Sequence, residues 1–238
     1  NKSTTKPFNA GAPQGTRSGP NDFKLLINNL CFDVDYAKYV DDITMSSVSL
    51  NACDNSLQSA ANYLCGWTLN NGMRINVCKT KEMLIHLSPT TNLNSVPNIV
   101  INGEEVERVT TFKLLGVVFS SDLSWDSHVA FVLSKTAKRM YCIRLLVRAR
   151  VRQSDIVQVY CSIIRSVLEY ACPVWHPGLT KAQSDDLERV QRRCLKLIYP
   201  SNSYNEALSI SGLERLAVRR ENITMRLFNE MKADGHVL

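Results

Sequence analysis

The first half of the chain mixes helical and strand periodicities of its apolar residues. Helical spacing predicts helices over residues 22–30 and 50–67, the second with Ser49 or Asn51 as its N-cap. Alternation of apolar and polar residues predicts two short strands over residues 36–45, with a bend at 40–42. Further strands are expected at residues 83–87, in a hairpin around Asn102-Gly103, and as one buried apolar strand over 112–119 with Gly116 inside it.

The second half of the chain shows helical patterns alone. They predict helices over residues 128–150, 154–170, 180–199 and 213–231. Thr180 followed by Gln183 has the form of a capping box at the start of the third. The sequence therefore predicts an α+β fold, in which antiparallel strands with helices are followed by an all-helical region, dividing near residue 120.

Composition is that of an ordinary globular protein, with 45% hydrophobic and 21% charged residues among 238. The eight cysteines are scattered without a Cys-x-x-Cys pair, so we expect reduced, mostly buried thiols of an intracellular protein. No zinc site is expected, because Cys172 and His176 lie four apart but no second pair completes a tetrahedron. We expect no membrane span and no signal peptide; the missing initiator Met suggests a fragment of a longer protein.

The net charge of +6 is unevenly distributed. Residues 1–110 carry 9 Lys/Arg against 10 Asp/Glu, and residues 111–238 carry 19 against 12. From charge alone, such a basic block is either a solvated helix face or the footprint of binding to a phosphate backbone. The densest block has no acid among its cations: Lys135, Lys138, Arg139, Arg144, Arg148, Arg150 and Arg152.

The tetrapeptide Tyr39-Val40-Asp41-Asp42 is the sharpest chemical feature of the chain. Two adjacent carboxylates at a tight bend repel each other, and a divalent cation such as Mg²⁺ removes that cost through hard oxygen ligands. Two such ions can stabilise the attacking and leaving oxygens of nucleotidyl transfer. An exposed Asp-Asp turn without function is the alternative. Asp33 and Asp35 nearby match no motif and are expected to face solvent.

This tetrapeptide belongs to an ordered series of motifs. Gly11-Ala12-Pro13-Gln14-Gly15 precedes it, and Asn76-x-x-Lys79-Thr80 and Phe112-Lys-Leu-Leu-Gly116 follow it. Together they resemble the motif series of reverse transcriptases, in particular those of LINE-type retrotransposons, which lack long terminal repeats. The same resemblance extends to Ile27-Asn-Asn-Leu30, Leu123-Ser-Trp125 with His128, Leu168-Glu-Tyr-Ala-Cys-Pro-Val-Trp175, and Leu187-Glu-x-Val-Gln191.

The resemblance implies roles for particular residues. Asp41 and Asp42 would hold the catalytic Mg²⁺ (or Mn²⁺), and Tyr39 and Val40 would line the floor near the primer terminus. Lys79 would act near the leaving pyrophosphate; its alternative is a solvated surface lysine. The remaining implied contacts are with the template–nucleotide pair (Pro13, Gln14, Gly15), with the primer end (Phe112, Leu115, Gly116), and with the phosphate backbone through a thumb helix (Lys135, Lys138, Arg139, Arg144, Arg148).

The same resemblance implies a domain plan with a part missing. Residues 1–120 would be a partial palm without the fingers or the strand bearing the first catalytic aspartate, 121–200 a helical thumb or connection, and 201–238 a helical extension. Asn29 replaces an aspartate usual in the family. Because only ten residues precede Gly11 and none is acidic, we expect the chain by itself not to polymerise DNA.

Three readings of function follow. The first is a segment of an RNA-directed DNA polymerase that uses an RNA template, a DNA primer and deoxynucleotides in its intact parent, in the nucleus and cytoplasm. The second is a truncated, catalytically dead relic that binds nucleic acid weakly. The third, an unrelated helical interaction protein, requires the ordered motifs to be a coincidence.

Overall fold

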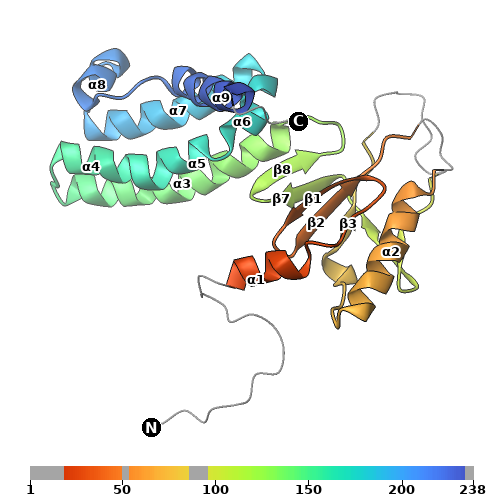
Figure 1. The fold of residues 1–238 in the computed structure, drawn as a ribbon. Coiled ribbons are helices and arrows are strands. Elements are labelled where there is room, and N and C mark those ends of the chain that lie inside the picture. Colours follow the sequence, from red (N-terminus) through yellow and green to blue (C-terminus); the bar gives the residue numbers. More distant parts are fainter. Residues whose placement is uncertain (1–18, 50–53, 86–95, 234–238) are drawn as a thin grey trace, which may run out of the picture. The chain divides into compact units, whose positions relative to one another are not determined.

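The structure, a computed structural model, describes residues 19–49, 54–85 and 96–233 (Figure 1). The chain divides into two compact units, residues 1–84 with 88–109 and residues 85–87 with 110–238. Among the described residues, strands occur only up to Ser120 and all later elements are helices. The prediction of a mixed α and β fold that becomes purely helical after about residue 120 is therefore confirmed.

The first unit is built from short elements. Its helices are α1 (Gly19–Leu26), α2 (Ser56–Asn70) and the single 3-10 turn η1 (Val77–Lys79). Its strands are β1 (Asp35–Tyr39), β2 (Asp42–Ser46), β3 (Lys81–Glu82), β4 (Val100–Ile101), β5 (Glu104–Glu105) and β6 (Glu107–Arg108).

Two of its three strand pairs are antiparallel hairpins. Strand β1 pairs with β2, and β4 pairs with β5. The predicted hairpin at Asn102-Gly103 is confirmed; both residues have positive φ, 54° and 83°, as a tight two-residue turn between twisted strands requires. The third pair, β3 with β6, is parallel, so the predicted antiparallel strands are accompanied by one short parallel pair.

Three predicted boundaries in this unit are wrong. The first helix ends at Leu26, before a turn over residues 27–29. Helix α2 begins at Ser56 instead of near residue 50, because Asp54 accepts hydrogen bonds from the amide and hydroxyl of Ser56. The strand expected over 83–87 is Lys81–Glu82, where Glu82 forms an ion pair with Arg108 of the neighbouring strand at 3.0 Å; residues 86 and 87 lie outside the described residues.

A small core joins α2 to the β4–β5 hairpin. Ala61, Ile101 and Val106 are buried together at its centre. The side-chain amide of Gln58 accepts from the Val100 amide and donates to the Val100 carbonyl, both at 2.8 Å. A glutamine on a helix thus pairs with both backbone polar groups of a strand residue, as a neighbouring strand would.

The second unit is a short hairpin followed by a helical bundle. The hairpin strands are β7 (Thr111–Leu114) and β8 (Val117–Ser120). The helical elements are α3 (Asp126–Arg148), α4 (Gln153–Tyr160), the π-helical segment η3 (Cys161–Arg165), α5 (Ser166–Glu169), α6 (Cys172–Trp175), η4 (His176–Gly178), α7 (Lys181–Ile198), α8 (Tyr204–Ser211) and α9 (Leu216–Ala233).

The single strand predicted over residues 112–119 is wrong. The chain reverses at Leu115 and Gly116, so that Leu114 pairs with Val117 and Phe112 with Phe119. Leu115 and Gly116 have φ of 46° and 90°. Gly116, which the apolar pattern placed inside a strand, is therefore the turn residue that makes the reversal possible.

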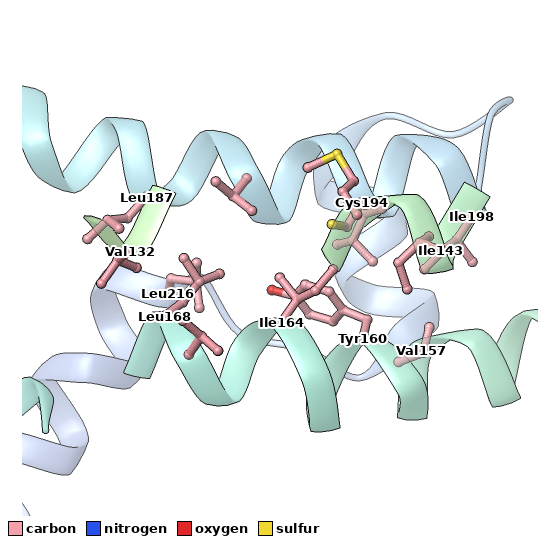
Figure 2. Packing of buried hydrophobic residues seen from close by; sticks show 14 of the residues in the cluster. Val132, Ile143, Val157, Tyr160, Ile164, Leu168, Leu187, Cys194, Ile198 and Leu216 are labelled. Carbon is pink, nitrogen blue, oxygen red and sulfur yellow. The ribbon is translucent and has the colours of Figure 1, made fainter. Parts of the chain in front are cut away.

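The bundle surrounds one hydrophobic core (Figure 2). Side chains of α3, α4, η3, α5, α7 and α9 meet there, and Tyr160, Ile164, Leu168, Leu187 and Leu216 are fully buried. The Tyr160 hydroxyl donates to the side-chain oxygen of Gln191 at 2.7 Å, so its polar end is satisfied inside the core. The capping box predicted at Thr180 and Gln183 is confirmed at the start of α7.

The cysteines differ from the expectation of mostly buried thiols. Of those in the described residues, Cys172 and Cys194 are buried, and Cys31, Cys78 and Cys142 are exposed. Burial raises the pKa of Cys172 to about 11 and that of Cys194 to about 12, so these two thiols stay protonated at neutral pH. All described cysteines are free. None of the described helices is both long enough and apolar enough to cross a membrane.

Candidate functional site

The Tyr39–Asp42 tetrapeptide forms the turn of the β1–β2 hairpin. Tyr39 pairs with Asp42 across the two strands, so Val40 and Asp41 are the two turn residues. Val40 has φ of 54°, in the left-handed region that a β-branched residue rarely adopts. Such backbone strain, of order 1–3 kcal/mol, is found most often at functional sites. The predicted bend at residues 40–42 is confirmed.

Both carboxylates of the pair are available to a ligand. Asp41 and Asp42 are exposed, and no hydrogen bond or ion pair within the described residues engages either side chain. Two adjacent carboxylates supply the hard oxygen donors that Mg²⁺ prefers, so the residues present fit a divalent cation. No group of three His, Cys, Asp or Glu side chains able to hold a metal occurs among the described residues. Within the described residues, the pair offers two carboxylate ligands.

Lys38 supports this hairpin, and its position was missed by the sequence argument. Its ammonium donates to the carbonyl oxygens of Ile27 and Leu30, at 2.9 and 2.8 Å. These carbonyls belong to the segment that follows α1, which contains Asn29. The only available sequence signal was a lysine one position before the tetrapeptide, on a strand with little apolar character. Lys38 thus connects the carboxylate turn to the preceding motif.

Lys79 ends the 3-10 turn η1. The side chain of Asn76 accepts a hydrogen bond from the Lys79 amide at 3.2 Å, and the Thr80 hydroxyl donates to the Asn76 carbonyl at 3.0 Å. These bonds explain the spacing of Asn76-x-x-Lys79-Thr80 as a local cap. Lys79 is exposed, whereas Lys81 forms an ion pair with Glu107 at 2.5 Å. Lys79 belongs to the same unit as the carboxylate pair.

The other predicted contact residues divide between two places. Pro13, Gln14 and Gly15 lie outside the described residues. Phe112, Leu115 and Gly116 belong to the β7–β8 hairpin of the second unit, where Leu115 and Gly116 form the turn. The turn exposes the Leu115 side chain, whereas Phe112 is half-buried.

The five cations predicted on α3 do not share one face. At about 100° per residue, Arg144 projects about 180° from Lys135 and about 140° from Arg139 around the helix axis. The guanidinium of Arg139 donates to the Ile163 carbonyl at 2.5 Å, which uses part of its binding capacity inside the protein. Lys138 and Arg148 are exposed. The expectation of a single basic face is therefore wrong.

Arg144 joins cations of another helix. A groove of about 350 Å³ between α3 and α7 is lined by three cations, Arg144, Arg193 and Lys196, and by Met140 and Leu197. No acidic side chain lines it. Arg193 and Lys196 were not identified from the sequence, because only the packing of α3 against α7 brings these distant positions together.

Comparisons with known proteins agree with the motif series. The family described as "Reverse transcriptase (RNA-dependent DNA polymerase)" matches residues 1–119. The chain therefore belongs to the reverse transcriptase family.

The curated relatives that the chain resembles are proteins of mobile elements. The chain is 23% identical, over its whole length and 27% of the relative, to the RNA-directed DNA polymerase from mobile element jockey of Drosophila melanogaster. It is 25% identical to the protein of the same description from Drosophila funebris, over 73% of the chain and 20% of the relative. It is also 25% identical to the Retrovirus-related Pol polyprotein from type-1 retrotransposable element R1 of Bradysia coprophila, over 81% of the chain and 20% of the relative.

These likenesses confirm the predicted resemblance to reverse transcriptases of LINE-type retrotransposons. The chain spans between a fifth and about a quarter of the length of these relatives. No solved structure matches it.

Proposed function

We propose that the chain supplies part of the palm, the thumb and a helical extension to an RNA-directed DNA polymerase of a LINE-type retrotransposon. Residues 1–120 are assigned to the palm, 121–200 to the thumb or connection, and 201–238 to the extension. The observation that carries the proposal is the exposed, unpaired Asp41–Asp42 pair on a strained hairpin turn, in a chain of the reverse transcriptase family.

Asp41 and Asp42 are the residues that hold a divalent cation, Mg²⁺ or Mn²⁺, in this proposal. When bound, the cation supplies Lewis-acid stabilisation of charge at a transferred phosphoryl group. The hairpin positions the two carboxylates. Pairing of Tyr39 with Asp42 fixes the turn between them, and Lys38 connects β1 to the segment after α1 by hydrogen bonds. Tyr39, 62% exposed, offers an aromatic surface to the primer terminus or the nucleotide.

The other assigned residues act on the nucleic acid and the nucleotide. Lys79 places a positive charge near the leaving pyrophosphate, and Pro13, Gln14 and Gly15 contact the template–nucleotide pair. The β7–β8 turn supports the primer end. The phosphate backbone of the template–primer duplex is contacted mainly by the thumb cations in the groove between α3 and α7, Arg144, Arg193 and Lys196. The other cations of α3 contribute less: Lys135, Lys138, Arg139 and Arg148.

A primer-extension assay tests the catalytic assignment. In the intact polymerase that carries this chain, Asp41→Asn should lower incorporation more than about 100-fold, since a metal-ligating carboxylate is replaced by a neutral amide. Asp33→Asn is the matched control: Asp33 is also exposed and lies outside the turn, so its loss should leave incorporation unchanged. Equal activity of Asp41→Asn and the parent would refute the assignment.

The 238-residue chain alone should give no incorporation. The support is that, among the described residues, no third acidic or histidine side chain joins the two carboxylates to complete a metal-binding group. Incorporation by the purified chain that disappears on Asp41→Asn would contradict this expectation. If the intact polymerase binds a template–primer duplex but never extends it, the function is that of a relic retaining only nucleic-acid binding.

A further inference from the structure

Tyr170 lies against the turn of the β7–β8 hairpin from a helical segment far along the chain. Its hydroxyl donates a hydrogen bond to the Leu115 carbonyl at 2.8 Å across 55 residues of sequence. Its ring also covers Gly116: a Cβ at that position would lie 2.9 Å from the Cε1 atom of Tyr170. Leu115 and Gly116 are therefore held by one side chain through a hydrogen bond and a close van der Waals contact.

The geometry of the turn is stabilised by such a partner. Leu115 adopts φ of 46°, in the left-handed region that is unfavourable for a residue other than glycine. An external hydrogen bond to its carbonyl favours that conformation over alternatives. Gly116, at φ of 90°, carries no side chain and so admits the tyrosine ring. The turn is thus shaped to receive Tyr170.

The backbone of Tyr170 is itself fixed by contacts with the helical bundle. Helix α5 ends at Glu169 with Tyr170 as its C-cap, and the next residue, Ala171, takes φ of 50°, so that the chain turns into α6. The indole of Trp175, which is fully buried, donates to the Tyr170 carbonyl at 3.0 Å. The backbone of Tyr170 is therefore fixed to the core of the bundle while its side chain extends toward the hairpin.

The hairpin has separate anchors to α3. The Val118 amide donates to Nδ1 of His128 at 3.2 Å. The ammonium of Lys113 lies 4.7 Å from the centre of the Phe131 ring. These contacts hold the strands, whereas among the side-chain hydrogen bonds of the described residues only that of Tyr170 reaches the Leu115 carbonyl of the turn. Its contribution is thus to the conformation of the turn itself.

We propose that Tyr170 is a positioning residue for primer extension, which sets the Leu115–Gly116 turn against the primer end. This inference rests on the proposed function, in which the turn supports the primer. Tyr170 is 54% exposed and Leu115 is 44% exposed. Both side chains are thus accessible beside the turn, where a primer end would meet them. A tyrosine needed only for the core would be buried with its hydroxyl paired inside, as Tyr160 is.

The test is steady-state primer extension by the intact polymerase carrying Tyr170→Phe. This change keeps the ring on Gly116 and removes only the hydrogen bond to Leu115. We expect kcat to fall about 5- to 10-fold, since misplacement of a reacting group slows the chemical step. The KM for the template–primer duplex should stay within about twofold, because backbone contacts on the thumb dominate duplex affinity. The thermal midpoint should fall by no more than about 4 °C, as the loss of one exposed hydrogen bond predicts.

Tyr141→Phe is the matched control. Tyr141 lies on α3, is 59% exposed and should leave kcat, KM and the thermal midpoint unchanged. A kcat for Tyr170→Phe equal to that of the parent would overturn the inference, as would a loss that occurs only in proportion to unfolded protein. An intact parent enzyme that never extends a primer would instead overturn the proposed function, so the two failures are distinguishable.

Discussion

At the scale of single residues, unusual backbone conformations mark the positions with the most specific roles. Val40 and Leu115 both occupy the left-handed region without being glycine, and each lies in a hairpin turn assigned to the reaction. Gly116 follows Leu115 and also has positive φ, but it additionally provides the space into which Tyr170 fits. A residue with both constraints should tolerate no side chain.

Substitution of two glycines should compare Gly116, which has both restrictions, with Gly66, which has neither. Gly116→Ala should lower the free energy of unfolding by about 2–4 kcal/mol, because it strains the backbone and overpacks the Tyr170 ring. Gly66→Ala, within α2 and with no atom within 4 Å of the new Cβ, should raise it by about 0.5–1 kcal/mol through helix propensity. Urea unfolding of the full chain measures both. Similar effects of the two substitutions would show that neither the left-handed backbone nor the contact with Tyr170 restricts position 116.

At the scale of secondary-structure elements, irregularities occur where elements meet. The helix predicted over residues 154–170 is continuous in the structure, but contains the π-helical segment η3. The carbonyl of Ile163 in this segment accepts the hydrogen bond of Arg139. Similarly, β8 meets α3 through His128, whose ring lies 5.2 Å from that of Trp175 between centres. One histidine therefore joins a strand and two helical elements.

This junction should make the second unit sensitive to acid. His128 accepts the Val118 hydrogen bond at Nδ1, so its neutral form is the one that the fold uses. Burial lowers the pKa of His128 below its usual value of 6.5. The unfolded chain then binds this proton at a higher pH than the folded chain. The stabilising contribution is complete above pH 6.5 and is lost as the pH falls through the folded pKa, with a slope of at most about 1.4 kcal/mol per pH unit.

His128→Asn isolates this contribution. The asparagine amide oxygen can replace Nδ1 as the acceptor for Val118, but it does not titrate. The variant should be less stable at neutral pH because it loses the ring contacts with Trp125 and Trp175. The free energy of unfolding, measured between pH 7.5 and 5.5, should depend less steeply on pH than in the parent chain. Identical slopes for the variant and the parent chain would show that acid destabilises the fold through groups other than His128.

At the scale of the whole molecule, helix packing decides which charged side chains become neighbours, as much as the sequence does. The basic block of α3 divides around the helix, and Arg144 meets Arg193 and Lys196 of α7 in a groove without acids. Cations that converge on one groove can neutralise neighbouring phosphates together, whereas scattered cations act singly.

The salt dependence of duplex binding should reveal which side of α3 contributes the contacts with phosphate. For the full chain with a template–primer duplex, the double change Arg144→Gln with Arg193→Gln should reduce the slope of log K against log salt by about 2. Lys135→Gln with Lys138→Gln, which removes the same charge from the other side of α3, should reduce it less. Equal reductions would place the contacts on both sides. Absence of binding even at low salt would contradict the proposed contact with nucleic acid altogether.

The sequence by itself determined the features that depend on local chemistry. The β1–β2 turn, the Asn102-Gly103 hairpin and the Thr180 capping box are all found where residue type predicted them. Each of these elements is specified within a few neighbouring residues by turn geometry, strand alternation or a side chain capping nearby amides. The ordered motifs likewise sufficed to indicate the family, since their order and spacing need no folded structure to be recognised.

The tertiary structure alone decided features that depend on residues distant in sequence. The apolar run around Gly116 satisfies a strand and a hairpin equally well by pattern, and the partner of the turn, Tyr170, lies more than fifty residues away. The sides of α3 differ because different helices pack beside them, which gives Arg144 the cationic neighbours of α7 and Arg139 a carbonyl of η3. Periodicity records which residues are apolar, but only packing selects the partner that each side chain meets.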